Sequence, residues 1–104
     1  METIAFRMVL NPGQSEEYRR RHREIWPELV EALHEAGIRD YWIFLDDATN
    51  HLFAVLKRER DHRMDQLVTD DVMRKWWGFM SDIMATGSDG APAQKPLVPM
   101  FYLP

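Results

Sequence analysis

One histidine of the chain has aromatic neighbours at helical spacing. His22 follows Tyr18 by four residues and precedes Trp26 by four, so on a helix the three side chains share a face. An imidazole titrates near neutral pH and, between flat aromatic walls, can move protons on a small neutral ligand. The same spacing suits a buried histidine whose ring is hydrogen-bonded to a backbone carbonyl. Both interpretations stay open at this level.

Two adjacent tryptophans, Trp76 and Trp77, form a second candidate group. Adjacent helical positions point about 100° apart, so the rings cannot serve the same wall of one core, and one is expected to line a cleft or rim. Indole faces suit the C–H faces of a sugar, and the indole N–H can donate to a hydroxyl. Tyr41 begins a β-rich run and could place its hydroxyl near the first helix. The alternative is that one tryptophan packs in the core and the other is merely half exposed.

The other polar residues give weaker signals. His34, His51 and His62 are not paired at metal-ligand spacing, and no His-Glu-x-x-His or cysteine pair occurs, which disfavours a metal site. We expect His34 at a helix C-terminus and the other two on the surface. The acidic pairs Asp46-Asp47 and Asp70-Asp71 are typical of turns and helix caps rather than of a glycosidase.

A basic run, Arg19 to Arg23, raises the possibility of RNA or phosphate binding. Glu16 and Glu17 stand four residues before Arg20 and Arg21, however, which is the spacing of ion pairs on a helix surface. The formal net charge of -4 also argues against a nucleic-acid or anionic-membrane partner. We therefore expect this run to form a solvated face.

Composition limits the architecture further. With 104 residues the chain is expected to form one domain, residues 1–104, whose core would gain from burial in an oligomer. It has no cysteine, so disulfides, thiolate metal sites and cysteine nucleophiles are unavailable, which fits a cytoplasmic protein. The longest apolar runs are about five residues, far short of a membrane span.

The elements that must position the candidate residues follow from hydrophobic periodicity. Alternating apolar side chains over residues 3–10 predict a strand. A helix is expected over residues 14–36, with Asn11 or Ser15 as the N-cap. Pro27 lies inside that helix and lacks a backbone donor, so we expect a kink or a restart there.

Two β-rich runs, residues 41–45 and 52–56, are separated by the turn-forming residues 46–51 and predict a hairpin. Neither run alternates cleanly with polar residues, so both faces of the sheet must be covered. The helices of the chain can cover only one face, and we expect the second face to pack against a partner sheet in a homodimer. In the first run, one face is formed by Tyr41, Ile43 and Leu45 and the other by Trp42 and Phe44.

The C-terminal half completes the pattern. Residues 60–85 are expected to be helical in two pieces, the second capped by Thr69 or Asp70. Residues 86–96 have loop composition, and a last strand over 97–104 must lie at an edge because it contains proline. The order βαββαβ is that of the ferredoxin-like α+β fold, an antiparallel sheet with its helices on one face. That fold hosts many functions and does not decide among them.

These features in combination resemble the L-rhamnose mutarotase family. The resemblance extends over essentially the whole chain and is specific in this combination. Its motifs are Glu17-Tyr18 through Arg21-His22, Ile25-Trp26-Pro27-Glu28-Leu29, the strand from Tyr41 to Asp46, Trp76-Trp77 and the terminal Phe101-Tyr102-Leu103-Pro104.

The resemblance implies an enzyme that interconverts the α and β anomers of L-rhamnose without a cofactor. It implies homodimers, described as dimeric α+β barrels, in which ferredoxin-like subunits exchange their C-terminal strands. It also implies that His22 is the catalytic proton donor. The residues implied to bind the sugar are Tyr18, Tyr41, Trp76 and Trp77, and no metal is required.

Two other functions remain as alternatives. Small cofactor-independent or haem-associated monooxygenases share the dimeric α+β barrel, and in them His22 would be a base or an axial ligand. A Soret band on adding haem would identify that class. A noncatalytic sugar-binding or regulatory module would bind L-rhamnose and leave the anomer exchange rate at its uncatalysed value.

Overall fold

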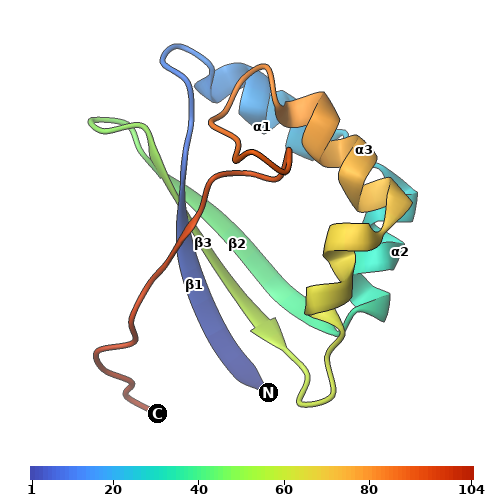
Figure 1. Ribbon diagram of the computed structural model, residues 1–104. Helices are drawn as coiled ribbons and strands as arrows, with labels where there is room; N and C mark the ends of the chain where they lie inside the picture. Colours follow the sequence, from blue (N-terminus) through green and yellow to red (C-terminus); the bar gives the residue numbers. More distant parts are fainter.

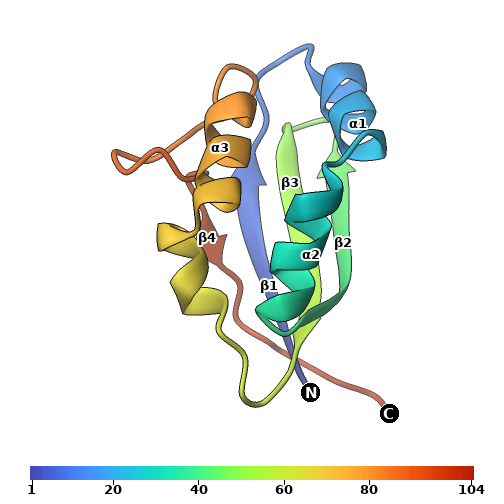
Figure 2. The same cartoon turned by 90° about the vertical axis from the view of Figure 1, so that its right-hand side faces the viewer.

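The computed structural model describes residues 1–104 as a four-stranded antiparallel sheet with helices on one face (Figure 1). The strand order β2-β3-β1-β4, with every neighbouring pair antiparallel, is that of the predicted ferredoxin-like arrangement. Figure 2 looks onto the helices, with the strands behind them. The elements in chain order are β1 (Glu2–Val9), α1 (Ser15–Arg23), α2 (Pro27–Glu35), β2 (Ile38–Asp46), β3 (His51–Arg58), the 3₁₀ helix η1 (Met64–Thr69), α3 (Asp71–Met80) and β4 (Lys95–Pro96).

The core lies between the sheet and the helices. Alternate residues of β1 and β3 point toward the helices and meet across the strands, as in the pairs Phe6 with Ala54 and Met8 with Leu52. The predicted alternation of the first strand is thereby confirmed. The buried apolar side chains are Phe6, Met8, Leu10, Tyr18, Leu29, Ala36, Ile38, Leu52, Ala54, Leu56, Leu67, Trp76, Met80, Ile83 and Met84.

An irregularity in β2 decides which of its side chains face the helices. Two residues, Asp40 and Tyr41, stand opposite the single residue Leu56 of β3, and Asp40 has a φ of 49°. This is a β-bulge. Strict alternation from the buried Ile38 would have turned Trp42 toward the core, but the extra residue reverses the phase. The predicted faces of this strand are therefore confirmed.

The predicted first helix is interrupted, and Pro27 explains where it starts again. Residues 24–26 separate α1 from α2, and Pro27 is the first residue of α2. The first helical position suits proline because its backbone N–H would lack a partner there in any case. The predicted restart is confirmed. The predicted N-cap is wrong, because Gln14 occupies that position and makes no side-chain capping bond.

The third helix begins as predicted and ends earlier. The Asp70 side chain accepts a hydrogen bond of 3.0 Å from the Met73 backbone N–H, the geometry of an N-cap. The α-helix stops at Met80, and Ile83 and Met84 reach the core from the turns beyond it. Helical structure over the whole of 60–85 was therefore too long a prediction. None of the helices has both the length and the apolar character that crossing a membrane requires.

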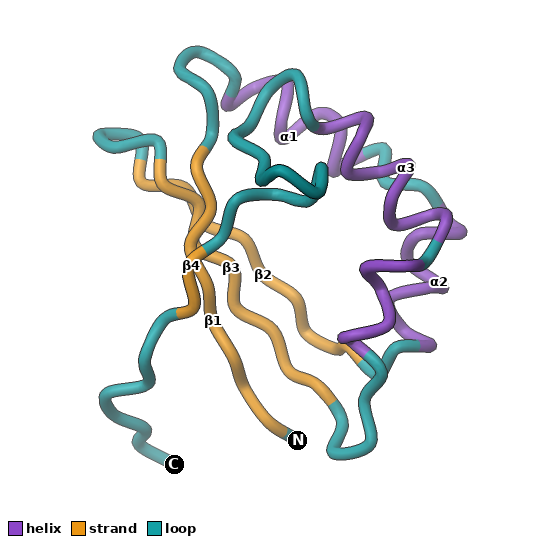
Figure 3. Tube along the Cα trace, in the orientation of Figure 1, coloured by secondary structure: helices purple, strands orange, loops and turns teal.

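The C-terminal strand is shorter and earlier than predicted. Only Lys95 and Pro96 pair with β1, followed by one hydrogen bond from the Leu97 backbone N–H to the Ala5 carbonyl oxygen. Residues 98–104 then leave the sheet as an exposed tail, visible in Figure 3 beside the C-terminal label. Pro99 cannot donate to a neighbouring strand, which disfavours continued pairing at this edge.

Candidate active site

A cavity of about 540 Å³ lies between the two N-terminal helices and the helix-facing side of β2. Its lining is mostly hydrophobic, with a few polar groups, as is usual for small-molecule sites. The structure brings four of the predicted site residues together on its walls: Tyr18, His22, Tyr41 and Trp76.

His22 has one ring nitrogen fixed and the other available. Its Nδ1 lies 2.9 Å from the backbone carbonyl oxygen of Tyr18, one turn earlier in α1. Because a carbonyl oxygen can only accept, we assign the proton of the neutral ring to Nδ1, which leaves the lone pair on Nε2. The main-chain hydrogen bond of one interpretation is present, and a cavity lies beside the ring, so the catalytic role of His22 stays a prediction.

Burial sets the charge of this imidazole. Desolvation lowers the pKa of His22 below its usual 6.5, and the hydrogen bond to the Tyr18 carbonyl opposes that shift only in part. The ring is therefore neutral at physiological pH and can accept a proton at Nε2. The Tyr18 ring stacks on it with centroids 4.3 Å apart and an interplanar angle of 27°.

The two tyrosines of the cavity are held in their protonated form. Burial raises the pKa of Tyr18, with a further contribution from the nearby Tyr41. Burial also raises the pKa of Tyr41 to about 12, although the residue as a whole is 39% exposed. The Tyr41 ring lies edge-on against that of Phe6, across β3, with ring centroids 6.5 Å apart. Both hydroxyls can therefore donate hydrogen bonds to a ligand.

The three neighbouring tryptophans have different surroundings. Trp76 is buried in α3 and meets His22 edge-on, with ring centroids 5.3 Å apart. Trp77 is half-buried and packs against the core, and it does not line the cavity of the single chain. Trp26 does not stack on His22 as the helical spacing suggested, because the chain leaves α1 before it. Its ring packs against Trp76 instead, at 5.1 Å.

Several lining residues were not singled out by sequence reasoning. Leu10 and Met73 contribute to the apolar lining, and Arg39 and Asp40, at the β2 bulge, add charged groups to it. His34 also lines the cavity and is exposed, as predicted, near the end of its helix. Nowhere in the chain do three or more histidine, aspartate or glutamate side chains gather as a metal site would require.

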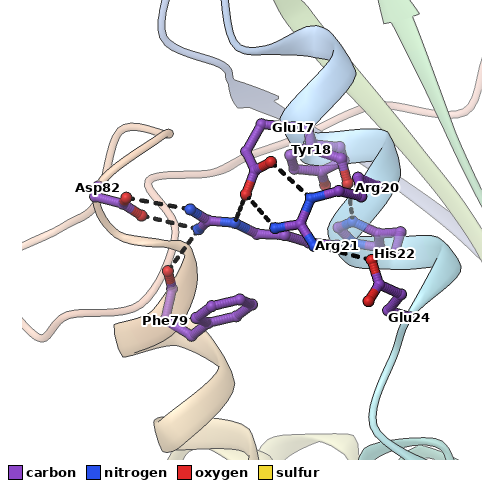
Figure 4. A network of polar contacts seen from close by, with 8 residues as sticks. All are labelled: Glu17, Tyr18, Arg20, Arg21, His22, Glu24, Phe79 and Asp82. Carbon is purple, nitrogen blue, oxygen red and sulfur yellow. Dashed lines mark hydrogen bonds and ion pairs between the residues drawn. The ribbon is translucent and has the colours of Figure 1, made fainter.

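The basic run behaves as predicted at one position and differently at the next (Figure 4). Arg20 forms exposed ion pairs with Glu17 in its own helix and with Glu24, the residue that follows the helix. Arg20, followed by Arg21, lowers the pKa of Glu17 to about 2, so this carboxylate stays charged. Arg21, however, is buried at 9% exposure and bonds to Asp82 near the end of α3. The prediction of a solvated face is wrong for Arg21.

Fold and site together define a class of protein. It is a ferredoxin-like α+β protein with an aromatic cavity that holds one neutral histidine and two protonated tyrosines, which suits proton transfer on a small uncharged molecule. The family model for L-rhamnose mutarotase matches residues 3–103. The chain belongs to the L-rhamnose mutarotase family, and the resemblance found in the sequence is confirmed.

Individual relatives agree with this assignment. The chain is 98% identical, over the full length of both proteins, to an L-rhamnose mutarotase of Burkholderia ambifaria strain MC40-6. It is 68% identical to one from Burkholderia cenocepacia strain HI2424, with 99% of each chain covered. The crystal structure of an L-rhamnose mutarotase from Formosa agariphila superposes with a TM-score of 0.92, at 41% identity and full coverage of both chains.

Proposed function

We propose that this protein interconverts the α and β anomers of L-rhamnose by general acid–base catalysis, with His22 as the catalytic residue. The observation that carries the proposal is the His22 ring itself. Its Nδ1 is tied to the Tyr18 carbonyl, burial keeps it neutral, and it stands on the wall of a cavity that has room for a monosaccharide. Membership of the L-rhamnose mutarotase family supplies the substrate.

The reaction needs two proton transfers and no change of oxidation state. In the opening step the anomeric hydroxyl gives its proton to Nε2 of His22, the bond between C1 and the ring oxygen breaks, and the ring oxygen takes up a proton. The aldehyde then rotates about the C1–C2 bond, and closure reverses both transfers. His22 is the proton acceptor during opening and the proton donor during closure. General acid–base help of this kind gives about 10²- to 10⁴-fold acceleration.

The second proton comes from a protonated neighbour. Tyr18 and Tyr41 are both protonated at neutral pH, and either hydroxyl, or a water bound to it, can donate to the ring oxygen on opening and regain the proton on closure. We propose that these tyrosines and Trp76 contact the sugar, and that the apolar lining receives its 6-methyl group. For Trp77 the proposed contact is supported by the family resemblance alone.

Anomer exchange measured by saturation-transfer NMR with L-rhamnose tests this function. We expect His22→Ala to fold and to leave the exchange rate at its uncatalysed value. His22→Asn is the sharper variant, because its side-chain amide can still donate toward the Tyr18 carbonyl but cannot titrate. Undiminished exchange in both variants would reject the role of His22.

Exchange measurements on the wild-type protein, together with two binding assays, separate the alternatives. A noncatalytic module would bind the sugar, seen as tryptophan fluorescence changes, without accelerating exchange in the wild-type protein. A haem-associated monooxygenase would give a Soret band on addition of haem. Comparing L-rhamnose with sugars that carry a 6-hydroxymethyl group tests the apolar pocket for the methyl.

We further propose a homodimer built on the outer face of the sheet. Trp42 and Phe44 lie there 61% and 56% exposed, with parallel rings whose centroids are 5.9 Å apart. Large exposed apolar groups of this kind mark interaction surfaces. Arg7, on the same face, has a buried Nε without a hydrogen-bond partner in the single chain, and a second chain could supply one. The exposed apolar side chains of the tail, which suit strand exchange, are Val98, Met100, Phe101, Tyr102 and Leu103.

The cytoplasm is the cellular location that we propose, on the cysteine-free composition of the chain. Fractionation of cells that carry the tagged full chain tests this location.

A further inference from the structure

Arg21, the residue before His22, joins α1 to the end of α3 (Figure 4). Its Nε donates to Glu17 at 2.7 Å, within α1. Its Nη1 donates to the Phe79 carbonyl oxygen at 2.7 Å, and the two Nη atoms bind both carboxylate oxygens of Asp82 at 2.9 and 3.2 Å. The guanidinium carbon also lies 4.4 Å from the centroid of the Phe79 ring. All these contacts beyond Glu17 reach the C-terminal end of α3.

The helix that Arg21 reaches, α3, also carries Trp76, which lines the cavity. Phe79 belongs to the last turn of α3, where carbonyl oxygens lack helical partners and a positive charge is favourable. Trp76 lies one turn earlier, and its ring contacts the Phe79 ring with centroids 5.7 Å apart. The same Trp76 ring meets His22 edge-on at 5.3 Å. Arg21 therefore connects α1, which carries His22, to α3, which carries the Trp76 ring that faces His22.

No other side-chain hydrogen bond joins α1 to α3 or to the turn that follows α3. Arg21 does not line the cavity, so it cannot act on a bound sugar directly. A planar guanidinium can engage a carboxylate with two parallel bonds while a third donor reaches a carbonyl, and a lysine ammonium cannot reproduce that geometry. Arg21, Asp82 and Phe79 therefore form a clamp between the two helices. We expect this clamp to set the distance between the rings of His22 and Trp76.

We propose that Arg21 is a positioning residue, which holds His22 against Trp76 at the spacing that proton transfer to the bound sugar requires. This inference rests on the proposed anomer exchange and adds a residue to it. Misplacement of a catalytic group by about 1 Å can cost about 10²-fold in rate. Loss of the clamp is therefore expected to lower kcat more than it raises KM.

Arg20 is the matched control for the experiment. It stands next to Arg21 and also bonds to Glu17, but its other partner is Glu24 in the same stretch of chain, so it does not reach α3. We expect Arg21→Met and Arg21→Lys to lower kcat for L-rhamnose exchange about 10- to 100-fold. The Arg20→Met variant should keep the wild-type kcat. Equal effects of Arg20→Met and Arg21→Met, or a change in KM alone, would overturn the proposal.

A second readout does not depend on catalysis. The ring protons of His22 lie against Trp76, so their NMR shifts report on the spacing of the two rings in the sugar-free protein. We expect these shifts to move in Arg21→Met and to stay in Arg20→Met. Unmoved shifts in a folded Arg21→Met protein would reject the clamp even if the enzyme proved inactive on L-rhamnose. If the shifts move in Arg21→Met but the wild-type protein shows no exchange activity, only the proposed function is rejected and the clamp stands.

Asp82→Ala keeps the test usable if Arg21→Met does not fold. The Asp82 side chain is 66% exposed, so its removal leaves no hole in the core. If the clamp acts through this carboxylate, Asp82→Ala should lower kcat and shift the His22 signals in the same direction. The double variant Arg21→Lys/Asp82→Ala should then be no slower than Arg21→Lys alone. Fully additive effects would show that the two residues act separately and would contradict the clamp.

Discussion

Acidification is expected to abolish the catalysed anomer exchange with a midpoint below pH 6.5. In the proposed mechanism His22 acts as a base, which requires an unprotonated Nε2, and burial lowers the pKa of this ring from its usual 6.5. One pH unit below that pKa only about a tenth of the rings are neutral, so the rate falls about tenfold for each further unit. Above pH 6.5 the rate should be flat, because the pKa of Tyr41 is about 12.

Acidification is also expected to lower the stability of the folded state. A histidine whose folded pKa lies below its unfolded value stabilises the folded state in its neutral form. That contribution is present above pH 6.5 and is lost as the pH falls through the folded pKa of His22. Urea unfolding of wild type and His22→Asn at several pH values should therefore show a larger acid-dependent loss in the wild type.

Saturation-transfer NMR at each pH, with the uncatalysed exchange rate subtracted, measures the profile. His34 also lines the cavity, and His34→Gln is the control that shows whether this second histidine affects the profile. We expect His34→Gln to keep the midpoint and His22→Asn to show no catalysed exchange at any pH. A rate that rises on acidification, or a midpoint above pH 6.5, would refute the assignment of His22 as a neutral base.

Two further substitutions test the binding wall and the outer face. Tyr41→Phe removes a hydroxyl but keeps the ring that packs on Phe6. Because a neutral hydrogen bond is worth about 0.5–1.5 kcal/mol, we expect kcat/KM for L-rhamnose to fall about 2- to 13-fold with little change in thermal stability, and unchanged kinetics would remove Tyr41 from the site. Trp42→Glu places a charge on the proposed dimer face and should give monomers in sedimentation velocity. The control Val68→Glu, at an exposed apolar position of η1, should leave the dimer intact. A wild-type protein that is monomeric at all concentrations would contradict the dimer.

The parts of the fold that depend on local patterns were predictable. Alternation along β1 located that strand and its buried face, β-rich composition located the runs in β2 and β3, and Pro27 marked the restart between two helices. The end of α3 was placed too late because Ile83 and Met84 keep a helical apolar spacing after the helix has ended. The terminal residues look like a strand by composition, but the ladder with β1 ends at the hydrogen bond from Leu97 to Ala5, and Pro99, two residues further on, has no backbone N–H to donate.

The site was predictable in its residue types more than in its geometry. Helical spacing placed Tyr18 beside His22, and adjacency of the tryptophans implied that they would differ, without showing that Trp76 would be the one on the cavity. Arg21 was assigned to the surface because Glu17 has the spacing of an ion-pair partner. Its other carboxylate partner, Asp82, lies 61 residues away, and no local pattern reports a contact at that separation.

The bulge at Asp40 gives β2 two separate duties. On one side the strand presents Tyr41 to the cavity, and on the other it carries the exposed rings of Trp42 and Phe44. A single inserted or deleted residue near this bulge would exchange the two sets of rings. Tyr41 would then face solvent, and Trp42 and Phe44 would face the helices. Length changes in this segment should therefore be far less tolerated during evolution than replacements of side chains.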